Sequence, residues 1–142
     1  TQGGVVTRLG GKESIWVPSG AMYPSTTNGC AAIAQVETTA LRPDLKVLDF
    51  DASSDEFAQF AIAFPKGWNE GTVTFQPFWT VTGSNDLMVS VESGAVTIAG
   101  SPAVGDQVFF QINRDVSADA QTGDARLLGV KLFFVTSEAN DA

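Results

Sequence analysis

Residues 56–82 constrain the fold most, because they contain two runs of alternating apolar side chains separated by a turn. Side chains of a β-strand alternate between its two faces, so every second residue shares a face. These apolar positions are Ala58, Phe60, Ile62 and Phe64 in the first run, and Val73, Phe75, Trp79 and Val81 in the second. Residues 65–71 contain a proline, two glycines and an asparagine, which are typical of turns. The pattern predicts a β-hairpin whose aromatic face needs a second sheet to cover it.

The rest of the chain consists of short apolar runs separated by turn residues. We expect further strands at residues 14–17, 21–23, 30–39, 45–50, 87–91, 95–99, 106–113 and 125–136. Strands spaced about 8–12 residues apart, with no helical segment long enough for a βαβ unit, are typical of sandwiches and barrels. The sequence therefore predicts an all-β fold, an antiparallel β-sandwich, with a jelly roll as the favoured version.

The last expected strand is apolar on both faces. By alternation, one face carries Leu128, Val130, Leu132 and Phe134, and the other carries Leu127, Lys131, Phe133 and Val135. The second face is too apolar to lie entirely in water, which makes it a candidate surface for contact with another copy of the chain.

The chain length of 142 residues fits one domain with a sizeable core. Residues 1–14 contain two Gly-Gly pairs and three charges, with only Val5, Val6 and Leu9 to bury. We therefore expect an N-terminal arm at 1–14 that orders on a neighbouring subunit, and a single β-sandwich domain at 15–142.

Charge and hydropathy exclude two classes of partner. Sixteen acidic against eight basic residues give a net charge of −8, which repels phosphate backbones, and no basic stripe opposes this. No stretch approaches the roughly 18 consecutive apolar residues of a membrane span. We expect neither nucleic-acid binding nor membrane insertion. The single cysteine, Cys30, cannot form an intrachain disulfide, and its apolar neighbours predict a buried thiol.

The absence of histidine excludes the usual Ser-His-acid and Cys-His arrangements and zinc sites built on histidine. One cysteine cannot form a thiolate cluster, and no phosphate-binding glycine motif follows a strand. We therefore expect no enzymatic activity and no cofactor. A glycosidase pair of carboxylates remains an alternative, because a sequence does not show the separation of two acids.

An acidic cluster at Asp49, Asp51 and Asp55 offers oxygen ligands to a hard cation such as Ca²⁺. The spacing lacks the glycine and the closing glutamate of an EF-hand loop. A solvated strand end explains the same residues, and on this interpretation no metal is expected.

Three aromatic residues, Trp16, Tyr23 and Trp68, are candidate contacts to a protein partner or a glycan, because aromatic rings can stack on sugars. Trp79 alternates with core residues and is expected to be buried. Trp68 lies in a turn, where its ring is either tucked back into the core or offered to a partner. A shelf formed by Trp68 and Tyr23 would favour glycan recognition.

Several motifs occur in a characteristic order: W-V-P-S-G-A-M at 16–22, P-K-G-W-N-E-G-T-V at 65–73 and D-A-R-L-L-G-V-K at 124–131. In these motifs the chain resembles a widespread group of small virion proteins of tailed bacteriophages, over most of its length from Trp16 onward. Members of the group carry a longer segment after the Trp79 strand, often an acidic hairpin. Here only residues 82–86 stand in its place.

The resemblance implies a structural protein that decorates or stabilises the capsid, or forms a head or tail fibre, through protein–protein contacts. It implies a homotrimer on the virion surface, assembled in the host cytoplasm, with the major capsid protein or other virion proteins as partners. The alternative is a receptor-binding module of the tail that recognises host surface carbohydrate. The group supplies no catalytic residues to transfer to this sequence.

Overall fold

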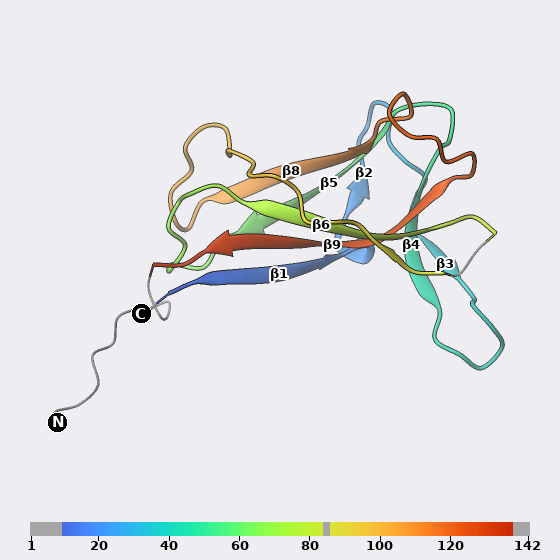
Figure 1. The fold of residues 1–142 in the computed structure, drawn as a ribbon, viewed down its shortest axis with the longest axis horizontal. Coiled ribbons are helices and arrows are strands. Elements are labelled where there is room, and N and C mark those ends of the chain that lie inside the picture. The colour runs from blue at the N-terminus through green and yellow to red at the C-terminus, as the bar shows by residue number, and fades with distance from the viewer. Residues whose placement is uncertain (1–9, 84–85, 138–142) are drawn as a thin grey trace, which may run out of the picture.

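The computed structural model describes residues 10–83 and 86–137, and these form two antiparallel sheets packed face to face (Figure 1). The expected all-β sandwich is therefore confirmed. The jelly-roll version is not confirmed, because one sheet has six strands and the other has three.

The larger sheet is organised around its longest strand, β9 (Ala125–Val135). One edge of β9 pairs with β6 along most of its length, and the other edge pairs first with β4 and then with β1. A strand of eleven residues is long enough to hold two partners on one edge. The other strands of this sheet are β1 (Lys12–Pro18), β3 (Ala34–Val36), β4 (Leu45–Phe50), β6 (Thr74–Val81) and β7 (Met88–Val89).

The smaller sheet contains β2 (Tyr23–Pro24), β5 (Glu56–Ala63) and β8 (Gln107–Arg114), with β5 in the middle. A single 3₁₀ turn, η1 (Ser19–Ala21), carries the chain from β1 in the larger sheet to β2 in the smaller one. The buried hydroxyl of Ser19 donates a hydrogen bond to the carbonyl of Leu127, which fixes this turn against β9.

The predicted hairpin of residues 56–82 is wrong, although its apolar faces are right. β5 pairs with β2 and β8, whereas β6 pairs with β9 and β7, so the two strands lie in opposite sheets. Residues 64–73 cross one end of the sandwich instead of closing a hairpin. The backbone N–H of Asn69 donates to the carbonyl of Val135 at 2.9 Å, which anchors this crossing to the end of β9. Alternation shows which face of a strand is buried, but not which strand it pairs with.

A β-bulge changes the predicted faces of β9. Phe78 of β6 pairs with Gly129 and the next residue, Trp79, pairs with Leu127, so Leu128 is an extra residue on β9. Leu127 therefore turns into the core with Val130, Leu132 and Phe134. The expectation that Leu128 shares the core face and Leu127 the opposite face is wrong.

Other strands are shorter than expected. Residues 30–39 contribute only β3, residues 87–91 contribute only β7, and residues 95–99 contribute one bridge, between Val96 and Val73. β1 begins at Lys12, so the last residues assigned to the arm belong to the larger sheet. Residues 1–9 of the expected arm lie outside the described residues.

An aromatic cluster fills one end of the core. The ring of Phe64 stacks on Trp68 with centroids 4.3 Å apart, and meets Phe134 edge-on at 5.5 Å. Phe110 of β8 stacks on Phe60 of β5 at 5.4 Å. The cluster thus joins both sheets to the crossing at 64–73. Offset and edge-on aromatic pairs of this kind stabilise the fold beyond the effect of their buried area.

Candidate functional site

The outer edge of β8 is open. β8 is the last strand of the smaller sheet, and no other strand in the described part of the chain pairs with this edge. The strand is eight residues long and contains neither proline nor lysine, the residues that commonly protect exposed edges. Its backbone groups along this edge can therefore pair with an added strand.

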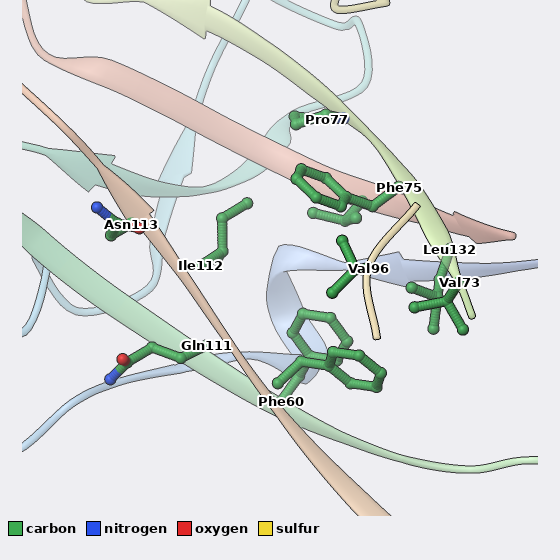
Figure 2. A pocket seen from close by; sticks show the side chains of 11 residues that line it. Phe60, Val73, Phe75, Pro77, Val96, Gln111, Ile112, Asn113 and Leu132 are labelled. Carbon is green, nitrogen blue, oxygen red and sulfur yellow. The ribbon is translucent and has the colours of Figure 1, made fainter. Parts of the chain in front are cut away.

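A cavity of about 240 Å³ lies beside this edge, between β6 and β8 (Figure 2). Phe75 and Val96 project into it from the side of the larger sheet and Ile112 from β8, whereas Gln111 points away. A second cavity, of about 200 Å³, continues past Pro77 and Ile112, which line both. We refer to the two cavities together as the open groove.

The groove exists because the smaller sheet does not cover all of β6. The inward side chains of β6, and Phe110 and Ile112 of β8, remain only part-buried, whereas most inward side chains of β5 and β9 are almost completely buried. Beyond β6 and its short partner β7, residues 90–95 are irregular and are held in part by serine side chains. The indole Nε1 of Trp79 donates to Oγ of Ser90 at 3.0 Å, and the backbone N–H of Phe75 donates to Oγ of Ser93 at 2.9 Å. Trp79 is part-buried and lines the second cavity, so its expected burial is incomplete.

Arg114 closes one end of the groove and is 8% exposed. Its guanidinium donates to Asp119 at 2.8 Å and to four backbone carbonyls, those of Phe50, Asp51, Gln121 and Gly123, at 2.7–3.2 Å. The backbone N–H of Gln121, followed by Arg114, lowers the pKa of Asp119. The arginine thus holds together the loops that follow β4 and β8. No motif in the sequence predicts this role.

The acidic candidates do not form a site. Asp49 accepts from Nε of Arg126 at 3.2 Å, across the β4–β9 pair. Asp51 accepts from the hydroxyl and the backbone N–H of Ser53, and these bonds lower its pKa. Asp55 accepts from the backbone N–H of Val116 at 2.9 Å. Across residues 10–83 and 86–137, no three acidic or cysteine side chains are grouped so that they could hold a metal ion. Each candidate carboxylate is used in a local contact instead.

The three aromatic candidates are not brought together. Trp68 is 3% exposed and stacked on Phe64, so its ring is tucked back and does not reach a glycan or a partner. Trp16 is 48% exposed on the outer face of the larger sheet, and Tyr23 is 47% exposed on the smaller sheet. The shelf of Trp68 and Tyr23 does not form.

Phe109 is an exposed aromatic residue that the sequence analysis did not single out. It is 65% exposed on the outer face of β8, opposite Ala61. The pairing of β2, β5 and β8 places Tyr23, Gln59 and Gln111 in one row on the same face. Alternation could have predicted its exposure, because Val108 and Phe110 point inward and Phe109 between them must then point outward.

Comparison with family models, with curated proteins and with solved structures found no match to this chain. Among the described residues, no helix is long and apolar enough to cross a membrane.

Proposed function

We propose that this chain is a structural protein of a tailed-phage virion that decorates or stabilises the capsid, or forms a head or tail fibre, by protein–protein contacts. The observation that carries the proposal is the open side of the sandwich, where an unpaired strand edge lies beside an apolar groove. Surfaces of this kind are used to bind other chains. The assignment to a virion rests on the resemblance in the three motifs at 16–22, 65–73 and 124–131.

The positions of these motifs support a role in the scaffold. Residues 16–22 contain the turn by which the chain changes sheets, and residues 65–73 form the crossing that buries Trp68. Residues 124–131 form the bulged half of the central strand β9. All three motifs therefore maintain the sandwich, as expected for a protein whose function is to assemble and not to catalyse.

A map of the intact particle by electron cryo-microscopy tests the proposal. We expect sandwich density on the capsid lattice or on a fibre, in contact with the major capsid protein or another virion protein. Absence of the chain from purified particles, measured by mass spectrometry, would refute it. The expected homotrimer has a separate test, since sedimentation equilibrium should give three times the 14.9 kDa mass of one chain.

Recognition of host carbohydrate by a tail module is a second candidate function, favoured by the outer face of the smaller sheet. Tyr23 is exposed there at the end of the row formed with Gln59 and Gln111, and Phe109 is exposed two residues from Gln111 on β8. Aromatic rings can stack on sugar rings, and amides can both donate to and accept from hydroxyl groups. Glycan binding lost in Tyr23→Ala and Phe109→Ala, but kept in the control Leu41→Ala on a distant loop, would favour this function over capsid decoration.

A further inference from the structure

The open edge and the open groove lie next to each other, and one additional strand would cover both. A strand added to the free edge of β8 would lie about 4.8 Å from it and would cover the inward side chains of β6. Its inward residues would enter the two cavities of about 240 and 200 Å³. A cavity of about 150 Å³ is enough to bind benzene, so each has room for at least one aliphatic side chain.

We propose that the fourth strand of the smaller sheet is supplied by residues 3–9 of a second copy of this chain. This inference deepens the proposed function, because it names the partner that the open side binds. The segment reads G-G-V-V-T-R-L. Alternation places Val5, Thr7 and Leu9 on one face, where they fit an apolar groove, and Val6 and Arg8 on the other. Seven residues of strand extend about 23 Å, which matches most of the eight-residue edge of β8.

Charge complementarity favours this occupant. Arg8 is the only charged residue among the first nine, so the segment is positive, whereas the whole chain has a net charge of −8. Asp106 lies immediately before β8. At the other end of the strand Asp119 also lines the groove, but its charge is paired with that of Arg114. An extended basic segment can therefore approach the acidic sandwich with less repulsion than a second sandwich would meet.

The topology directs the segment to a neighbour and away from its own groove. The described chain begins at Gly10, two residues before β1, and Gly10 packs against the backbone of Thr136. β1 lies on one edge of β9, whereas β6 and the groove lie beyond the other edge, and β1 and β8 lie on opposite sides of Figure 1. The end between them is occupied by the crossing at 64–73, where the N–H of Ser137 donates to the carbonyl of Gly67. If each copy gives its segment to the next copy and accepts one from the previous copy, the contact is heterologous, and three such contacts that close a ring would give the proposed trimer.

Chemical cross-linking of the purified full-length chain tests this arrangement. One population carries Val6→Cys and a second carries Gln111→Cys, both in a Cys30→Ala background, so that each chain has one thiol. After mixing, a short bismaleimide should link the two populations. The matched control replaces Gln111→Cys by Leu41→Cys, a fully exposed position on the loop between β3 and β4, and should give no more than background linkage.

A truncated chain and a peptide complete the test. Because β1 begins at Lys12, removal of residues 1–9 leaves the described sheets intact, and circular dichroism checks that the truncated chain folds. We expect the truncated chain to lose the oligomeric species in sedimentation, and a peptide of residues 1–9 to bind it and raise its Tm. Three results would each overturn the proposal: oligomers that persist without residues 1–9, equal linkage to the Leu41→Cys control, or linkage within one chain when both cysteines are on it. A chain that is found on the particle but fails these tests would refute the strand exchange and leave the proposed virion function standing.

Discussion

Arg114 offers the sharpest test of how this sandwich is held together. Its side chain is 6% exposed and donates five hydrogen bonds, four of them to backbone carbonyls at the end of β4 and on the loops that follow β4 and β8. The substitution Arg114→Met keeps an unbranched chain of similar length but removes every donor. The carbonyl of Phe50 is then left in a buried contact, and the other acceptors are part-buried.

The cost follows from the number of acceptors left without a donor. A buried acceptor that loses its partner costs about 1–3 kcal/mol, and the part-buried ones cost less because water can replace the arginine. We expect a total loss of about 3–5 kcal/mol, the range found when one partner of a buried ionic network is removed. Domains of this size are stable by about 5–15 kcal/mol, so the variant should fold with a Tm lower by roughly 10–15 °C.

Urea unfolding followed by circular dichroism measures this loss, and Arg126→Met is the matched control. Arg126 donates to Asp49 at 3.2 Å and is more exposed, so its removal should cost less than about 1 kcal/mol. Arg114→Lys should recover only part of the loss, because an ammonium cannot reach four carbonyls in the planar pattern of a guanidinium. If Arg114→Met and Arg126→Met lose equal stability, the loops are not held by this network and the reasoning is refuted.

Three further predictions concern other parts of the chain. Hydrogen bonds, chiefly from the hydroxyls of Ser53 and Ser117, lower the folded-state pKa of Asp51 and Asp115. The stability that these two carboxylates contribute is therefore present above about pH 5 and is lost as the pH falls below about 4. Asp51→Asn keeps an acceptor without a charge, and urea unfolding between pH 3 and 7 should show a shallower acid dependence; an unchanged slope would contradict the assignment. A Cβ on Gly129 would lie 2.5 Å from Cζ2 of Trp16, so Gly129→Ala should lower the free energy of unfolding by about 1–3 kcal/mol. The loss should be smaller in a Trp16→Ala background, and strictly additive losses in the double variant would count against the contact. Burial raises the pKa of the Cys30 thiol to about 11, so an aromatic disulfide reagent at pH 8 should react with it only after unfolding, and rapid reaction of the native chain would disprove its burial.

The sequence predicted which side chains are buried better than it predicted how strands pair. The core faces of β5 and β8 follow from simple alternation, and Ala58, Phe60 and Ile62 lie where the pattern places them. The pairing of β5 and β6 did not follow, because two apolar faces can be neighbours in one sheet or face each other across the core. The length of the crossing decides between these, together with contacts such as the Asn69–Val135 bond that join residues far apart in sequence.

The alternation of apolar residues also did not predict the bulge in β9. Leu127 and Leu128 are both apolar, so the sequence does not show at which of them the alternation changes phase. Gly129, just after the bulge, is the one sequence feature associated with it, because only a residue without a side chain fits beneath the ring of Trp16. For Trp68 the sequence left two positions open, and stacking on Phe64 selects the buried one.

The candidate site was the least predictable feature. It is a free strand edge beside an uncovered groove, and the described chain does not supply the strand that would cover them. No residue type marks a free strand edge. In the sequence, Phe75, Pro77 and Ile112 look like ordinary core positions, and only the structure shows that they line a groove. The acidic and aromatic residues that did stand out are used within the chain or lie on separate faces.

The charge of the chain and its open side act together on assembly. A free, apolar strand edge promotes uncontrolled pairing between sheets, and β8 has neither proline nor lysine to prevent it. Copies that each carry a net charge of −8 repel one another, but this repulsion is screened beyond about 8 Å at physiological ionic strength. It therefore acts most strongly as two whole sandwiches come into contact, and much less on one extended segment whose only charge is Arg8. A net acidic surface with a basic segment thus disfavours stacking of sandwiches and leaves strand exchange as the contact that buries the groove at low electrostatic cost.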